Sequence, residues 1–479
     1  MRKKTIFAAC LTLATMPVLA GGLVTNTNQN AAFLRQLSQE AIIDITGLYA
    51  NPAGTAFLGR GFHLSLNVQN AKQSRDITTT FPLFAYNENN RSRTHKFEGK
   101  ASAPVVPSFL LSYNWDKWSF NAHGGLTGGG GKAEFDNGLG TFEALYAGQI
   151  YSQVSAALAQ TNAAYAAIGS DLAYNGYTMR AYMKGRQYHF GLSLGTTYKF
   201  RDNLSGYFGL RGVYATNNYN GWVSDVKIST ASAQAAAGNA GVAAVKAGAE
   251  AQINGQLAQS TLDLNTDQTG FGITPIIGVD WRINRHWNVA AKYEAPTKLT
   301  LKNKSKMNAY TEQVAATNAT LGQFADGKKV RNDIPGILTL GAQYTPVEKV
   351  RLMGGFHYYF DKQAKQYGDK QKQIKHGTWE ITGGAEYDAH RLVTVSAGWQ
   401  ITRYGLKDSY MNDLSFVTNS NSVGFGVRLH ATDRLDVDLS YMQTIYHRRD
   451  VSTPTAAGAK DDHYFRTNRV LGVGFNLKF

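Results

Sequence analysis

The chain ends with LGVGFNLKF, residues 471–479, in which apolar residues occupy every second position. The apolar positions are Leu471, Val473, Phe475, Leu477 and Phe479, and the residues between them are small or polar. Successive side chains of a β-strand point to opposite faces, so this alternation predicts a strand with one apolar face and one polar face.

The aromatic residue that closes this strand adds a second indication. Phe479 in this position is similar to the C-terminal signal of outer-membrane β-barrels, which the barrel-assembly machinery recognises. We therefore expect the strand to be one of many in a barrel whose apolar face meets lipid.

The N-terminus is consistent with export. Basic residues at positions 2–4, an apolar stretch and the small-residue site Val18-Leu19-Ala20 predict a signal peptide over residues 1–20. The sole cysteine, Cys10, lies within it, so we expect a mature chain without disulfides, thiolate metal sites or cysteine catalysis.

The composition fits a membrane barrel. The mean hydropathy is −0.31, and no segment approaches the 18 uninterrupted apolar residues of a transmembrane helix. A barrel needs apolar residues only at alternate positions, and 49 glycines, 26 tyrosines and 23 phenylalanines suit it. The formal net charge of +15 suits lipopolysaccharide phosphates or anionic ligands, and we expect no nucleic-acid partner.

Alternating segments recur along the whole chain and predict about fourteen strands. They lie at 61–73, 94–114, 117–125, 187–200, 203–217, 271–283, 286–299, 336–345, 350–360, 376–387, 391–403, 421–431, 434–447 and 467–479. Connections between them alternate strictly between short and long, which predicts an up-and-down barrel with tight periplasmic turns and long extracellular loops. The fold class is therefore all-β, a transmembrane antiparallel barrel of the outer membrane.

Individual strands indicate which residues face lipid. In the strand at 187–200, Phe190, Leu192 and Leu194 are predicted to point outward, whereas His189 and Ser193 point into the lumen. Trp118, Trp281 and Trp287 lie close to short turns, where amphipathic rings form a girdle at the bilayer interface.

Two long loops, 141–173 and 229–260, are rich in alanine and other helix formers. In the first, Phe142, Leu145 and Tyr146 recur near helical spacing. This pattern predicts either a helix packed on the barrel rim or an apolar groove where hydrophobic molecules first bind, and the two readings are compatible.

Residues 21–60 precede the first strand and are neither strand-patterned nor of low complexity. They are more apolar than a free tail, so we expect them to fold into the lumen as a small hatch. The predicted organisation is a signal peptide at 1–20, a hatch at 21–60 and a barrel at 61–479.

Several features make the chain resemble the FadL family of outer-membrane transporters for long-chain fatty acids and aromatic hydrocarbons. One is Asn51-Pro52-Ala53-Gly54 in the segment before the first strand, and another is the block 105–135, VVPSFLLSYNWDKWSFNAHGGLTGGGGKAEF. The third is the layout of the whole mature chain. One departure is that the helical loops follow the third and fifth strands, not the fifth and seventh.

The resemblance implies passive uptake of a hydrophobic molecule. Ligand would bind a groove in the outer loops, pass to a lumen site above the hatch, and leave sideways through a gap made by a kink in the third strand. Gly124 and Gly125 fit such a kink, because glycine is tolerated where a ladder is broken. The alternative for these glycines is the start of a flexible loop.

A ligand carboxylate would require a cation in the lumen. Arg211 and Lys292 are the candidates, because both are inward positions in mid-strand. The alternative is that these cations pair with lumen acids such as Glu294.

Other functions fit the sequence less well. His189, His357 and Tyr359 could serve a haemin receptor, and a structural or adhesive barrel would need no ligand site. Gly191-Leu192-Ser193-Leu194-Gly195 matches a hydrolase motif but lies inside a strand, where its serine is not exposed. We expect a monomer that is not an enzyme, with outer-membrane lipid and lipopolysaccharide as neighbours and no catalytic residue, metal or cofactor.

Overall fold

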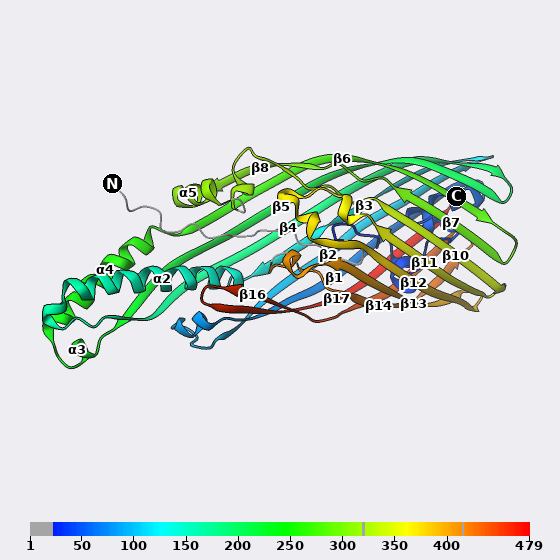
Figure 1. The fold of residues 1–479 in the computed structure, drawn as a ribbon. Coiled ribbons are helices and arrows are strands. Elements are labelled where there is room, and N and C mark those ends of the chain that lie inside the picture. The colour runs from blue at the N-terminus through cyan, green and yellow to red at the C-terminus, as the bar shows by residue number, and fades with distance from the viewer. Residues whose placement is uncertain (1–22, 319–320, 414–415) are drawn as a thin grey trace.

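The computed structural model describes residues 23–318, 321–413 and 416–479 (Figure 1). Within them, fourteen antiparallel strands form a closed barrel in which β17 pairs with β1. These strands are β1 (Gly61–Thr80), β2 (Thr94–Trp115), β3 (Trp118–Phe135), β4 (Ala173–Arg201), β5 (Leu204–Ala231), β6 (Leu262–Arg282), β7 (Trp287–Glu294), β10 (Ile337–Val347), β11 (Val350–Tyr359), β12 (Ile374–His390), β13 (Val393–Leu406), β14 (Ser420–Thr432), β15 (Leu435–Tyr446) and β17 (Gly458–Lys478). The predicted barrel is confirmed, whereas the predicted signal peptide, residues 1–20, lies outside the described residues.

The predicted strands correspond one to one with the barrel strands, but the predicted long connections are too long. The connection between the predicted strands at 117–125 and 187–200 contains the end of β3 and the start of β4. Three further strands also lie in expected loops: β8 (Thr300–Met307), β9 (Lys329–Arg331) and β16 (Arg449–Thr455). Beyond the membrane both faces of a strand meet water or polar neighbours, so the apolar alternation that reveals a lipid-facing strand is lost.

The helices lie mainly in the long connections. They are α1 (Ala31–Gln36), α2 (Gly140–Ala164), α3 (Ala233–Ala236), α4 (Ala240–Ala258) and α5 (Ala309–Thr317), with the short 3-10 helices η1 (Ile45–Tyr49), η2 (Pro52–Phe57), η3 (Pro82–Tyr86), η4 (Ala166–Ile168), η5 (Leu321–Phe324), η6 (Asp361–Gln363), η7 (Tyr367–Gln373) and η8 (Asp408–Tyr410). Helices α2 and α4 confirm the two predicted helical loops, and they follow the third and fifth strands. Among the described residues, no helix is both long and apolar enough to cross a membrane.

The outer face of the barrel carries an apolar belt. Phe190, Leu192 and Leu194 are 50%, 51% and 57% exposed, whereas His189 and Ser193 of the same strand are buried. Trp118, Trp281 and Trp287 are exposed near the short turns, as predicted. An exposed apolar belt bounded by aromatic rings is the pattern of a lipid-facing surface, so the chain has the architecture of an outer-membrane barrel.

Two strands project far beyond this belt. β4 has 29 residues, about 95 Å at the usual rise of ~3.3 Å per residue, whereas crossing a bilayer takes about 9–11 residues. Together with β5 they form a long arm that carries α2, α3 and α4 at its end (Figure 1).

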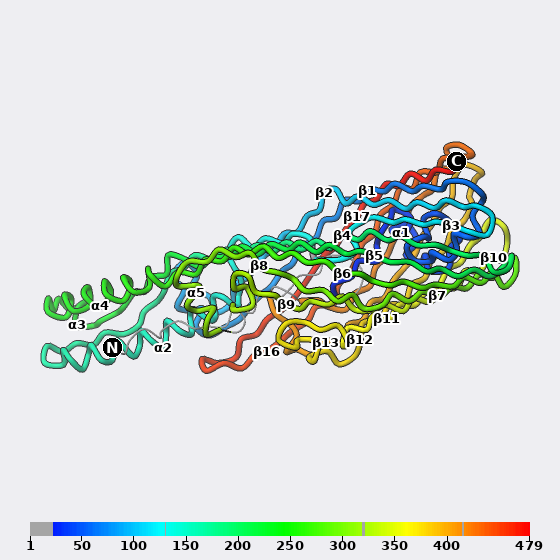
Figure 2. Tube along the Cα trace, turned by 90° about the horizontal axis from the view of Figure 1, so that it is seen from above, coloured from blue at the N-terminus to red at the C-terminus, as the bar shows by residue number. Residues whose placement is uncertain are grey.

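Residues 23–58, called the inner segment below, lie within the barrel near its short-turn end (Figure 2). Helix α1 packs against β12–β15, β17 and β1, and η1 and η2 pack against β1–β6. Each of the three helices begins at a capping side chain. Asn30, Asp44 and Asn51 accept hydrogen bonds from the amides of Phe33, Thr46 and Gly54.

Candidate functional site

The wall of the barrel is interrupted between β2 and β3. Residues 109–115 of β2 pair with residues 118–124 of β3, and pairing returns only at Gly99 and Lys100, which face Phe135 and Glu134. The unpaired stretch between these two flanks is called the gap below.

The two sides of the gap differ in length by one residue, because residues 101–108 of β2 lie opposite residues 125–133 of β3. A shift of one residue exchanges the two faces of a strand, so no regular ladder can join both flanks. Pro104 and Pro107 lie on the β2 side, where a missing N–H leaves no donor unpaired.

Glycines form the β3 side of the gap. The register between β3 and β4 shifts at Leu126/Gly128 and again at Gly128/Gly131, and Gly129 and Gly131 adopt positive φ values of 89° and 64°. Such backbone is favourable for glycine alone, so this run supports a bulge. The bulge begins two residues beyond the predicted kink at Gly124 and Gly125.

Gly124 and Gly125 mark the end of the regular pairing. Gly124 is the last residue of β3 that pairs with β2 before the gap, opposite Phe109, whose ring would collide with any side chain at position 124. Gly125 is the first residue of the gap, and a Cβ there would lie 3.1 Å from the Cβ of Ser108. The role of both glycines in lateral opening stays a prediction.

The inner segment reaches the bulge from the lumen side. The Asn26 amide donates to the Thr127 carbonyl at 2.9 Å, and the Gly129 amide donates to the Val24 carbonyl at 3.1 Å. The Gln29 side chain also donates to the Leu126 carbonyl at 2.9 Å. The inner segment therefore lies directly behind the gap, held there by neutral hydrogen bonds.

On the opposite wall the inner segment is held by charge. Arg35 of α1 lies 2.9 Å from Asp438 and 2.5 Å from Glu386, and all three side chains are buried. Arg428 bridges Asp438, at 2.9 Å, to Asp44 of the inner segment, at 3.2 Å. Removing one member of such a buried network leaves an uncompensated charge, so this attachment is strong.

The motif Asn51-Pro52-Ala53-Gly54 forms the start of η2. Pro52 occupies the first helical position, where its missing N–H costs nothing, and the Asn51 amide also donates to the Asp280 carboxylate. The carbonyls of Pro52 and Ala53 accept hydrogen bonds from strand hydroxyls at 2.9 Å and 2.7 Å. The Gly54 amide donates to the capping Asn51 side chain. The motif therefore fixes this end of the inner segment to β4–β6.

The two candidate cations, Arg211 and Lys292, lie together with Glu294. Arg211 Nη1 is 2.5 Å and Lys292 Nζ is 2.7 Å from that carboxylate. The ring of Tyr49 packs beside both cations, with distances of 4.9 Å and 4.6 Å to its centroid. The structure therefore has the alternative arrangement, in which the cations pair with a lumen acid, and binding of a ligand headgroup stays a prediction.

Three residues of α2 were predicted to bind ligand. Phe142 and Tyr146 are buried and Leu145 is half-buried. Burial raises the pKa of the Tyr146 phenol, as expected for a dry apolar surrounding. Phe142 and Tyr146 belong to one apolar cluster that continues through the upper barrel to Leu23 and Val24 of the inner segment. This cluster therefore connects the helical arm to the bulge of β3.

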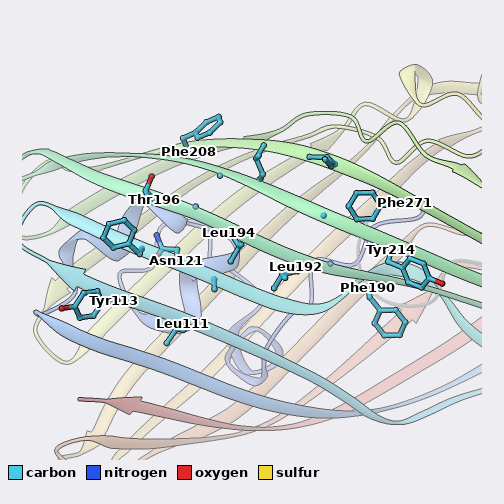
Figure 3. A pocket seen from close by; sticks show the side chains of 18 residues that line it. Leu111, Tyr113, Asn121, Phe190, Leu192, Leu194, Thr196, Phe208, Tyr214 and Phe271 are labelled. Carbon is cyan, nitrogen blue, oxygen red and sulfur yellow. The ribbon is translucent and has the colours of Figure 1, made fainter.

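An apolar groove lies on the outer wall below the gap (Figure 3). It crosses β2–β6, and its lining includes Leu111, Phe190, Leu194 and Phe271. Leu111 is paired with Ala122, two residues below the edge of the gap. A molecule that left through the gap would therefore meet an apolar surface within about 7 Å, at ~3.4 Å per residue.

Of the side chains named for other functions, His357, Tyr359 and Ser193 have polar partners, whereas neither ring nitrogen of the buried His189 has a hydrogen-bond partner among the described residues. His357 lies 2.9 Å from both Glu40 and Glu380, and Tyr359 donates to Glu380 at 2.7 Å. Ser193 accepts a hydrogen bond from Arg211 inside β4. Within the described residues, no group of three or more histidine, cysteine, aspartate or glutamate side chains could hold a metal ion.

The sequence did not predict the partners that fix the inner segment. Arg35, Asp44 and Tyr49 carry no periodicity that assigns them to a face, and only their charge or ring suggests a contact. The one-residue mismatch across the gap was equally hidden, although the prolines and glycines on its two sides are visible in the sequence.

No family model matches the chain, and no curated protein matches it by sequence. Solved structures do resemble its fold. A FadL homologue from Pseudomonas aeruginosa superposes with a TM-score of 0.64 at 14% identity, over 96% of this chain and 100% of that one. The toluene transporter TodX of Pseudomonas putida superposes with a TM-score of 0.55 at 14% identity, over 97% of this chain and 100% of that one. At such low identity the likeness shows the fold alone.

Proposed function

We propose that this chain is a member of the FadL family and acts as a passive outer-membrane channel for hydrophobic molecules. The observation that carries the proposal is the gap, which is backed by the inner segment and joined to an apolar cluster. The neighbours described as a FadL homologue and a toluene transporter support the same class of ligand. The chain acts as a channel and not as an enzyme.

Binding begins at the helical arm. A fatty acid or aromatic hydrocarbon is poorly soluble, and transfer from water to an apolar site is worth roughly 25 cal/mol per Å² of buried surface. Partly buried apolar residues packed against the cluster of Phe142 and Tyr146, among them Tyr86 and Tyr174, offer such a surface at the extracellular end. From there, apolar contacts continue to Leu23 and Val24, beside the bulge.

The ligand then leaves sideways. The inner segment acts as a hatch that blocks the straight path to the periplasm, because it contacts strands around the barrel. The gap between β2 and β3 is the remaining path, and it leads to the apolar groove on the outer wall. Lateral exit avoids returning the ligand to water, so the chain requires no coupled energy source when the cell consumes the ligand.

The experiment is an uptake assay in a Gram-negative strain that lacks its own channels for hydrophobic compounds. Cells with and without this protein receive labelled oleate, toluene or a disaccharide. We expect faster uptake of oleate or toluene and unchanged entry of the disaccharide. Equal uptake of both hydrophobic probes with and without the protein, or faster entry of the disaccharide, contradicts the proposal.

A further inference from the structure

Strand β8 carries a row of lysines on its outer face. Its sequence TLKNKSKM places Lys302, Lys304 and Lys306 on one exposed side, whereas Leu301 and Asn303 on the other side are buried. On β9, Lys329 lies directly opposite Lys302. Exposed Lys298 precedes β8, and these five residues are called the basic ladder below: Lys298, Lys302, Lys304, Lys306 and Lys329.

The basic ladder begins where the apolar belt ends. β8 pairs with the outer part of β6, with Lys302 opposite Thr269. After Thr269, the next residues of β6 that point out of the barrel are Phe271 and Ile273, which are 61% and 54% exposed. β8 lies on the side of the long loops (Figure 1). Because its lysines follow directly on exposed apolar residues, their positions fit the boundary between acyl chains and the polar layer.

The five positive charges of the ladder are only partly balanced, by the exposed Asp267 opposite Lys304. Among the described residues, none of the five ammonium groups is in an ion pair. Asp267, opposite Lys304, accepts a hydrogen bond from Asn218 at 2.9 Å. Lys302 and Lys329 repel each other across the strand pair, an arrangement that reduces stability.

Protection of a strand edge does not account for these lysines. Lysine is common on exposed edges, where it prevents pairing with another chain. Here one edge of β8 pairs with β6. The other is covered by β9 and the loop between β8 and β9, since the Asn303 side chain donates to the Gln323 carbonyl at 2.6 Å and the Ser305 amide donates to Asp326 at 2.8 Å. A positive row that is only partly balanced at the membrane boundary therefore indicates an anionic partner.

We propose that the basic ladder binds the phosphorylated headgroup of a glycolipid in the outer leaflet. Lysine binds phosphate as a point charge, and its long stem can lie along acyl chains while the ammonium stays in the polar layer. Lys302 and Lys329 form the centre of the site, and Lys298, Lys304 and Lys306 extend it along the strand. The inference rests on the membrane orientation in the proposed function, but not on transport.

The experiment measures binding of lipid A to the full chain in neutral detergent micelles, with dephosphorylated lipid A and inorganic phosphate as comparison ligands. The test variant is Lys302→Gln/Lys329→Gln. The control variant is Lys117→Gln/Lys349→Gln, which removes two exposed lysines from the short turns at the other end. Resistance of each barrel to unfolding in dodecyl sulfate without heating checks folding.

We expect the test variant to bind lipid A on the order of tenfold more weakly, since each lysine near a charged lipid surface contributes a factor of several. The control variant and the binding of dephosphorylated lipid A should be unchanged. Equal weakening by both variants, equal affinity for dephosphorylated lipid A, or saturation by inorganic phosphate at the same affinity overturns the proposal.

The same variants separate this inference from the proposed function. We expect the test variant to take up oleate or toluene at the rate of the unmodified chain. If no variant transports either probe, but the test variant still binds lipid A more weakly than the control, the transport proposal is wrong. The proposal that the basic ladder binds lipid A is then still supported. If uptake is normal and the test and control variants bind lipid A equally well, only the proposal that the basic ladder binds lipid A is wrong.

Discussion

The inner segment meets two very different walls. Toward β12–β15 the strands are paired without interruption over residues 393–402, and Arg35 and Asp44 join buried ion pairs there. Toward β2–β3 the pairing is broken and the contacts are hydrogen bonds between neutral groups. Neutral hydrogen bonds are exchanged at little cost, whereas buried charges cannot be separated cheaply. The difference supports the proposal of lateral exit at β2–β3, with the segment held at the other wall by its buried ion pairs.

The largest expected effect on the inner segment comes from breaking its ion pairs with β12–β15. Asp438→Asn removes the carboxylate that both Arg35 and Arg428 contact, and breaking such a buried network costs about 3–5 kcal/mol. Amides of α1 should therefore exchange hydrogen much faster, as measured by mass spectrometry.

The matched control is Asp436→Asn, two residues away on β15. Asp436 is only half-buried and pairs with His430, so exchange in α1 should change little. If the two variants have the same effect, charge does not fix the inner segment to this wall.

A smaller effect is expected from disturbing the neutral hydrogen bonds between the inner segment and β3. In Gly128→Ala the new Cβ would lie 2.3 Å from the Val24 carbonyl oxygen, so the inner segment must move away. Overpacking of this kind costs about 1–3 kcal/mol. The Asn26 and Gly129 amides should exchange faster, while α1 stays protected by its ion pairs.

Gly148→Ala in α2 is the control for this change. No atom lies within 4 Å of its Cβ position, and alanine is the better helix former by about 1 kcal/mol. Unchanged exchange at Asn26 in Gly128→Ala would show that the inner segment does not depend on the bulge.

The smallest expected effect tests whether the missing N–H of proline or the one-residue mismatch at the bulge causes the gap. Pro104→Ala restores an N–H on β2 and should lower stability by about 0.4–1 kcal/mol, because proline restricts the unfolded chain. The gap should persist, since its two sides still differ by one residue. The amides of residues 125–133 that point toward β2 should stay unprotected, whereas the Gly129 amide stays bonded to the Val24 carbonyl. New protection of the amides that face β2 would mean that the missing N–H, not the bulge, keeps the strands apart.

The sequence predicts the barrel strands because contact with lipid requires an apolar residue at every second position of a membrane-spanning strand. Alternation located all fourteen barrel strands, and the outward position of Phe190 and the inward position of Arg211 were both correct. Beyond the belt strands carry polar residues on their outer face, so the sequence predicts loop where β8, with lysine in place of apolar residues, forms. The pairing of Arg211 with Glu294 was one of the two predicted arrangements, whereas its contact with Tyr49 depends on how the inner segment folds back and leaves no local pattern.

The central claim, that hydrophobic ligand leaves through the gap, is tested by closing its lower end with Ser108→Cys/Gly125→Cys. The Cβ separation of 3.1 Å at this site is close to the ~3.5–4.5 Å of a disulfide, and the predicted mature chain has no other cysteine. Ser422→Cys/Thr444→Cys is the control, because these side chains already touch across the closed β14–β15 pair. We predict that oxidation stops uptake of oleate or toluene in the first variant, that reduction restores it, and that the control transports in both states. Full uptake by the oxidised first variant would contradict lateral exit.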